Sequence, residues 1–188
     1  SLDVFQTTIA DNTAISGVSG AGGMGGDYGG SPGNDGSAGL GQGGGVNSEY
    51  VGDVGNSIVA RNIASDDGPD VFGSFNSLGN NLIGDYGGST GFVNGVNSDI
   101  VGNSISPIDP MLGPLDDNGG PTFTRALLPS SPAIDAGAND DAPATDQRGF
   151  ERLYDGDFDG VITVDIGAFE FFPFAEDGSW FIAVNPVD

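Results

Sequence analysis

Apolar residues occur in short β-branched or aliphatic runs, at residues 4–9, 57–60, 81–83, 99–101 and 161–166. Each run ends at Asn, Asp or Gly, the residues that favour tight turns. No segment shows the convincing three-to-four-residue apolar spacing of an amphipathic helix. The pattern therefore predicts an all-β chain in which short strands are joined by tight corners.

An internal repeat refines this prediction, because residues 7–14 align with residues 57–64. Residues 46–52 also align with residues 96–102. Imperfect repeats of short strands are typical of a β-solenoid with rungs of roughly 20 to 30 residues. We therefore interpret residues 1–106 as solenoid rungs, with Asn12, Asn62 and either Asn80 or Asn81 at similar corners, where Asn side chains hydrogen-bond the backbone.

Residues 17–45 interrupt the rungs with a glycine-rich insertion. Glycine recurs every third residue from Gly17 to Gly29 and, after a slip of one residue, from Gly30 to Gly39. A period of three is that of a polyproline-II-like helix. We expect extended segments packed against each other or against the solenoid. A disordered glycine-rich loop is the alternative.

The charge balance limits the possible partners. Four Arg and no Lys oppose 27 Asp and Glu, for a net charge of −23, and no His is present. Such a surface repels nucleic acid and anionic lipid and attracts divalent cations, although a surface adapted to high salt is an alternative explanation. No run reaches the roughly 18 apolar residues that a membrane span needs, and Cys is absent. The first residue, Ser1, is not an initiator Met and no signal peptide is visible, so we expect a processed product or part of a longer protein.

The strongest candidate site is the acidic loop that begins at Asp155. Asp155, Asp157 and Asp159 alternate before Gly160, as do the first oxygen ligands of an EF-hand calcium loop, in which the residue after the glycine offers its carbonyl. The sequence therefore predicts Ca²⁺ bound by Asp155, Asp157, Asp159 and the Val161 carbonyl. The template fails at its twelfth position, Ile166, so we take Asp165 as the last ligand. Solvated Asp-Gly turns are the alternative.

From about residue 56 onward, an ordered series of motifs resembles the choice-of-anchor Q family, the C-terminal part of secreted right-handed parallel β-helix proteins, which are similar to polymorphic outer membrane protein repeats. The motifs are Asn56-Ser57-Ile58-Val59-Ala60, Asp70-Val71-Phe72, Ser77-Leu78-Gly79-Asn80-Asn81-Leu82-Ile83-Gly84, Asp109-Pro110-Met111-Leu112-Gly113-Pro114-Leu115, Asp117-Asn118-Gly119-Gly120-Pro121-Thr122, Ala126-Leu127-Leu128-Pro129, Ser131-Pro132-Ala133-Ile134-Asp135-Ala136-Gly137, Asp146-Gln147-Arg148-Gly149 and Asp165-Ile166-Gly167-Ala168-Phe169-Glu170. The resemblance implies a secreted or cell-surface β-helix with no catalytic residues and an adhesive or structural role.

Two further regions follow the rungs. Residues 107–170 are irregular and punctuated by proline, and we interpret them as an irregular β cap over the open end of the solenoid, held by the calcium loop. Within it, Arg148 is expected to form a structural ion pair among Asp146, Glu151 and Asp135. Residues 171–188 read as an apolar hairpin that packs on the cap or adds to the open edge of a neighbouring copy, giving a head-to-tail filament.

Three classes of function remain open from the sequence. The preferred one is a calcium-binding structural or adhesive surface protein, and the second is a glycan-binding module that uses exposed Tyr28, Tyr50, Tyr86 or Trp180 to bind cell-surface glycans. The third is a polysaccharide lyase or hydrolase. A lyase needs a basic group near its calcium, and this chain has neither Lys nor His. We therefore expect no enzyme activity.

Overall fold

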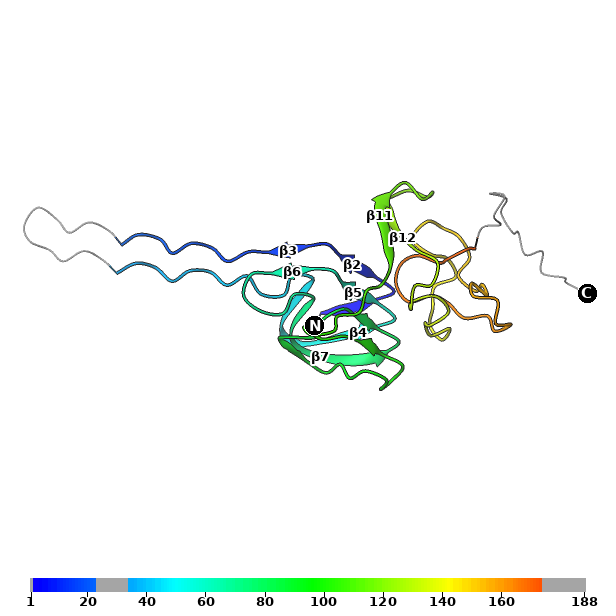
Figure 1. Ribbon diagram of the computed structural model, residues 1–188, viewed down its shortest axis with the longest axis horizontal. Coiled ribbons are helices and arrows are strands. Elements are labelled where there is room, and N and C mark those ends of the chain that lie inside the picture. Colours follow the sequence, from blue (N-terminus) through cyan, green and yellow to red (C-terminus); the bar gives the residue numbers. More distant parts are fainter. Residues whose placement is uncertain (1, 23–33, 174–188) are drawn as a thin grey trace, which may run out of the picture.

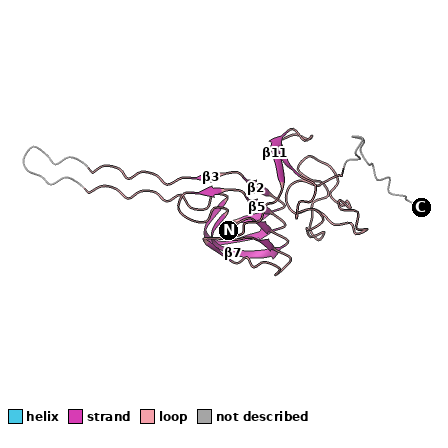
Figure 2. Ribbon diagram, viewed as in Figure 1, coloured by secondary structure: helices cyan, strands magenta, loops and turns pink. Residues whose placement is uncertain are grey.

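The computed structural model describes residues 2–22 and 34–173, and this part of the chain contains strands, turns and loops but no helix (Figures 1 and 2). The all-β prediction is confirmed. It follows that none of these residues forms a helix long and apolar enough to cross a membrane. The strands are β1 (Asp3–Phe5), β2 (Thr8–Ala10), β3 (Thr13–Ala14), β4 (Val46–Gly55), β5 (Ile58–Ala60), β6 (Ile63–Ala64), β7 (Val71–Gly79), β8 (Leu82–Ile83), β9 (Ser89–Thr90), β10 (Ile100–Val101), β11 (Leu112–Asp116) and β12 (Thr124–Leu127).

Most strands belong to two small parallel sheets that do not close. One sheet has the order β1-β4-β7-β9 and the other β2-β5-β8-β10. The chain visits them alternately, so that each strand of the first sheet is followed by a strand of the second. A third parallel pair, β3 with β6, extends the first two passes, and β11 and β12 form an antiparallel pair.

The pairing register confirms the first of the two repeats. Thr8 of β2 pairs with Ile58 of β5, 50 residues later. The next partners along this sheet are Leu82, a further 24 residues on, and Ile100, a further 18. The first step is long because it contains the glycine-rich insertion. The similarity of residues 46–52 to residues 96–102 does not reflect equivalent positions, because the former lie in β4 of the first sheet and the latter include β10 of the second.

A left-handed residue forms the corner between the two sheets in each pass. Gln6, Asn56, Asn80 and Asn97 have φ values between 50° and 52°, and each lies shortly before a strand of the second sheet. A left-handed residue turns an extended chain sharply, and Asn tolerates this conformation better than most residues. Of the predicted corner residues, Asn80 is one of these left-handed residues, whereas Asn12, Asn62 and Asn81 are not.

Hydrogen-bonded side chains stack along the corners. The backbone N–H and the side-chain amide of Asn12 both donate to Asn62 Oδ1, each at 3.0 Å, as the sequence predicted. Asn81 occupies a different corner. Its Oδ1 accepts from Ser57 N at 3.2 Å, and its own backbone N donates to Asp99 Oδ1 at 2.9 Å. Two polar ladders, and not one, therefore run across the passes.

The alternating side chains of the second sheet bury both of its faces. Val59 and Ile83 point between the two sheets, into a core that includes Val54 and Phe75. Ile58 and its outward neighbours pack against the following irregular region, in a second core of Ile58, Ala60, Leu82, Leu112, Leu127, Ala133, Ile166 and Phe169. Residues 107–173 therefore cover the outer face of this sheet. We expected them to cover its open end, and the difference arises because β5 and β8 are apolar on both faces.

The described parts of the glycine-rich insertion are two extended segments that run side by side away from the sheets (Figure 1). Gly17 N donates to Gly39 O at 3.1 Å, and Gly36 N donates to Gly20 O at 2.9 Å. The bonded glycines are three residues apart on each segment, so the expected packing of one segment on the other is confirmed here. Residues 23–33 lie outside the described part, as do residues 174–188 of the expected apolar hairpin.

Candidate metal centre

The loop from Asp155 to Val161 is folded by its own carboxylates. Asp155 Oδ2 accepts from Gly160 N at 3.0 Å, Asp157 Oδ1 accepts from Asp159 N at 2.9 Å, and Asp159 Oδ1 accepts from Val161 N at 2.7 Å. Gly160 has a φ of 90°, as the template requires of a glycine at the turn. Both interpretations of the loop, a calcium loop and a series of Asp-Gly turns, predict these bonds.

A second segment adds a carboxylate that the linear EF-hand template does not contain. Asp135, Asp155 and Asp157 each offer one oxygen within 4.8 Å of the others. Asp135 comes from a separate turn, has a φ of 50°, and accepts a hydrogen bond from Asp157 N at 2.7 Å. This group contains two of the predicted ligands, Asp155 and Asp157, but not Asp159 or Asp165.

Two carboxylate oxygens of this acidic group are buried without a hydrogen-bond partner in the described structure, Asp135 Oδ1 and Asp155 Oδ1. Burial raises the pKa of Asp135, hydrogen bonds from the backbone of Gly156 and Asp157 lower it, and the charges of Asp157 and Asp155 raise it. An unsatisfied buried carboxylate oxygen is costly. A hard divalent cation would neutralise the group and coordinate these oxygens.

Asp165 supports the acidic group from behind and is not a member of it. It is 1% exposed. One of its oxygens accepts from Asp135 N at 2.8 Å and the other from Phe171 N. Both carboxylate oxygens are thus engaged by backbone amides that fix the turn carrying Asp135. Val161 is exposed and uses its N–H on Asp159.

The acidic group adjoins a buried ionic network. Arg148 Nε donates to Asp146 Oδ2 at 2.8 Å, which confirms the structural ion pair for this partner. The Arg148 guanidinium also lies 3.5 Å from the ring centre of Phe169 and 4.7 Å from that of Phe150. Asp135, which was also expected beside Arg148, belongs to the acidic group with Asp155 and Asp157. Enclosure between rings and a carboxylate gives Arg148 a structural role.

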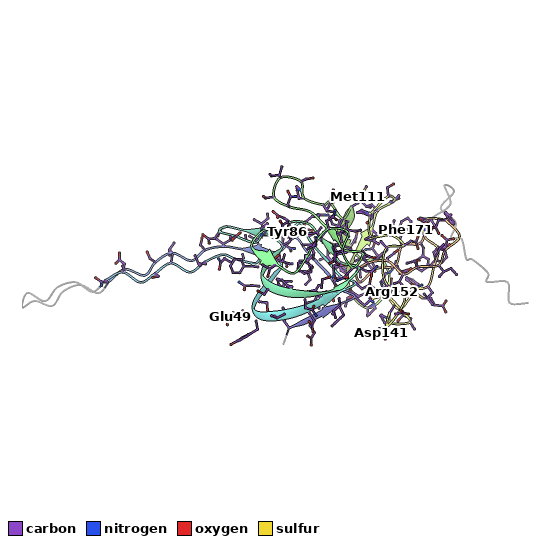
Figure 3. All side chains as sticks on the ribbon, turned by 90° about the horizontal axis from the view of Figure 1, so that it is seen from below. Glu49, Tyr86, Met111, Asp141, Arg152 and Phe171 are labelled. Carbon is purple, nitrogen blue, oxygen red and sulfur yellow. The ribbon has the colours of Figure 1, made fainter. Side chains whose placement is uncertain are left out.

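The second half of the network joins Arg152 to Glu170 and Asp165, and all three are 1% exposed. Arg152 Nε lies 3.5 Å from Glu170 Oε2, which also accepts from Asp165 N at 3.1 Å. Burial raises the pKa of Asp165 to about 7 and, together with the Asp165 charge, that of Glu170 to about 9, while Arg152 lowers both. Figure 3 shows Arg152 and Phe171 in this irregular region.

The balance of buried charges adds to burial, which is the main cause of the raised pKa values of Asp165 and Glu170. Asp146, Asp165 and Glu170 supply three buried acids against two buried cations, Arg148 and Arg152. The acids exceed the cations by one negative charge. At neutral pH, one proton retained by the Asp165–Glu170 pair neutralises this excess. The segment that positions Asp135 therefore rests on a network that is itself sensitive to charge.

The aromatic residues considered for glycan binding are only partly described. Tyr50, on β4, is 80% exposed, and Tyr86, after β8, is 42% exposed. Tyr28 and Trp180 lie outside the described residues. Comparisons with family models, with curated proteins and with solved structures gave no match for this chain. The functional interpretation therefore depends on the geometry of the site.

Proposed function

We propose that this chain is a calcium-stabilised structural or adhesive subunit of a secreted or cell-surface protein, built as a right-handed β-solenoid of the choice-of-anchor Q type. The observation that carries the proposal is the acidic group of Asp135, Asp155 and Asp157 with its two buried, unpartnered oxygens. Calcium fits better than magnesium, because it accepts irregular oxygen cages, whereas magnesium demands near-ideal octahedral geometry.

The alternating strand order supports the solenoid. Each pass of the chain supplies one strand to each of the two parallel sheets, and successive passes pair in parallel. The left-handed corners and stacked polar side chains recur from pass to pass. Such nearest-neighbour stacking is the organisation of repeat proteins.

Calcium would join two segments that are 20 residues apart, at Asp135 and Asp155. The Asp135 turn packs on the second sheet through Ile134 and Ala136, whereas the Asp155 loop is largely exposed. Bound metal would therefore fasten the loop to the body, and its binding free energy would add to the stability of the fold.

Calorimetric titration of chelator-treated protein with CaCl₂, followed by thermal unfolding, tests the proposal. At 100 times the dissociation constant, calcium should add about 2.7 kcal/mol, which is roughly 5 to 11 °C in Tm for a domain of this size. Absence of both heat and a Tm shift at millimolar calcium would remove the metal from the proposal.

Two matched variants locate the site. Asp135→Asn removes a charge from the acidic group but keeps an oxygen that can accept from Asp157 N, so it should abolish the calcium-dependent Tm shift. Asp159→Asn makes the same change in the loop, outside the group, and should largely retain the shift. The opposite result would show that the linear EF-hand template, and not the three-dimensional group, identifies the ligands.

Head-to-tail association is the second part of the proposal. β1 and β2 are edge strands of the two sheets at one end, and β9 and β10 are the edge strands at the other. The apolar segment after Pro173 would add to the β1–β2 edge of the next copy, as in strand-addition complexes. Repetition of such a heterologous contact gives a filament.

Negative-stain imaging of the full chain and of a chain ending at Pro173 tests this assembly. The truncation keeps Phe172, whose ring packs at 4.9 Å from Tyr154 and 6.1 Å from Phe150. We expect filaments only from the full chain, and disassembly on chelation if the calcium site supports the same region. Identical behaviour of the two chains would exclude the tail as the connecting segment.

A further inference from the structure

The paired segments of the glycine-rich insertion, residues 15–22 and 34–41, form an arm without a core of its own. A Cβ added at Gly17 would lie 3.6 Å from Gly39 N, and one added at Gly36 would lie 3.7 Å from Gly20 N. The two backbones thus face each other in van der Waals contact, with no side chain between them. Every apolar side chain of the arm must therefore point away from its interior.

Three large apolar side chains of the arm are exposed to an unusual degree. Ile15 is 75% exposed, Val18 is 95% exposed and Leu40 is 69% exposed. Ile15, Val18 and the exposed Ala21 follow one another at three-residue spacing, so they share a face of an extended segment with this period. Several strongly exposed large apolar side chains on one projecting element, unlike apolar residues scattered over a surface, are typical of an interaction surface.

The arm is also the least charged part of a strongly acidic chain. Residues 12–22 carry no charge, and residues 34–45 carry only Asp35, whereas the whole chain has a net charge of −23. The Asp35 carboxylate is engaged within the arm, because Oδ1 accepts from Gly22 N at 2.6 Å. Two copies repel each other when their bodies approach but not when their arms do.

The base of the arm is fixed to the body. Ser16 N donates to Ser65 Oγ at 2.8 Å, and Gly41 N donates to Asp66 Oδ2 at 2.6 Å. A side chain at Gly41 would collide with Ser65 and with Ser16, so the two segments can converge only because this residue is glycine. The arm consequently leaves the sheets at a defined place and projects beyond them (Figure 1).

We propose that the arm is a self-association element, which packs against the arm of a second copy of this chain and buries the Ile15, Val18, Ala21 and Leu40 faces of both. A second copy supplies the same uncharged apolar stripe, so the contact is self-complementary. The projection of the arm keeps the two acidic bodies apart. The inference uses neither the calcium site nor the C-terminal tail.

Sedimentation velocity of the chain ending at Pro173, with and without chelator, tests this inference without a contribution from the tail. We expect a dimer whose association strengthens with added NaCl, because salt screens the repulsion between the bodies and leaves the apolar contact intact. Combining Val18→Ser with Leu40→Ser should weaken the dimer at least tenfold, since each loses an apolar side chain from the contact.

Control variants separate the contact from changes in folding. Val18→Ile keeps an apolar residue and should preserve the dimer, and Ser19→Ala, one residue out of the three-residue register of the stripe, should do the same. The Tm of each monomer should be unchanged, because these side chains are exposed. A monomer at every concentration and salt would overturn the inference. So would unaltered dimerisation of the double Ser variant, or a monomer that binds uncharged phosphatidylcholine vesicles through the stripe.

Discussion

The most direct test of the buried ionic network is the substitution Glu170→Gln. Glu170 and Asp165 are buried beside Arg152, and together with Asp146 they exceed the two buried cations by one charge. Gln removes the excess acid but keeps an oxygen that can accept from Asp165 N, as Glu170 Oε2 does at 3.1 Å. The substitution therefore balances the charge without creating a cavity.

The sign of the effect follows from the raised pKa values. Folding raises the pKa of Asp165 to about 7 and that of Glu170 to about 9, so between pH 5 and pH 8 the folded pair retains at least one proton that the unfolded chain has lost. The stability from this proton is complete below the unfolded pKa and is lost as the pH rises through the folded pKa. One retained proton costs about 1.4 kcal/mol per pH unit.

Between pH 5 and pH 8 the wild-type protein should therefore lose at least about 4 kcal/mol of stability to this pair, which corresponds to roughly 8 to 16 °C in Tm. Glu170→Gln should match the wild type at pH 5 and exceed it by this amount at pH 8, because Asp165 then has Arg152 to itself and ionises in both states.

Thermal unfolding between pH 5 and pH 9 in chelator measures both curves. Burial also raises the pKa values of Asp70 and Asp135, so the difference between the two curves, and not the wild-type slope alone, reports the Asp165–Glu170 pair. Glu49→Gln is the matched control, because Glu49 is exposed on β4, and its curve should follow the wild type. Parallel curves for Glu170→Gln and the wild type would refute the excess buried charge.

Two further predictions concern the polar ladder and the glycine turns. Asn62→Ala should lower the free energy of unfolding by roughly 2 to 3 kcal/mol, because it removes a buried amide that bonds two passes of the chain. Asn12→Ala, at the exposed end of the ladder, should lower it by about 1 kcal/mol or less. Urea unfolding of the two variants measures the difference. Gly91→Ala should destabilise more than Gly95→Ala. Both glycines have positive φ, but a Cβ at Gly91 would collide with the Phe75 carbonyl, whereas nothing lies near Gly95; equal Tm values would contradict this reasoning.

Local patterns predicted the strands because their causes are local. Short β-branched runs ending at Asn or Gly specify strands and corners, and the equivalence of residues 7–14 and 57–64 reappears as pairing of Thr8 with Ile58. The position of residues 107–173 was not predictable in the same way. It depends on which faces of β5 and β8 remain apolar after the sheets assemble, and residues 57–60 read only as one continuous apolar run.

The candidate metal site shows the same division between local and long-range causes. Alternation and glycine identified Asp155 and Asp157 from the loop alone. Asp135 joins them only through the fold. The carboxylate of Asp165 accepts hydrogen bonds from Asp135 N and from Phe171 N, and so holds the turn that carries Asp135. The sequence offered one weak signal, an Asp before Ala136-Gly137 in an otherwise apolar stretch. Spacing alone points to Asp165 as the last ligand, because it is the acid nearest the template's last position. Spacing carries no information on burial, and Asp165 is buried with both of its oxygens bonded to backbone amides.

The placement of the irregular region has a consequence for assembly. Residues 107–173 lie on the side of the second sheet, so they leave β1 and β2 as edge strands at one end and β9 and β10 at the other. Edge strands invite pairing with other chains unless something opposes it. Here the net charge of −23 opposes the pairing of edge strands between copies. At physiological salt this repulsion acts only within roughly 8 Å. Contacts between copies should therefore form where charge is sparse, which favours the uncharged arm over the edge strands of the acidic body.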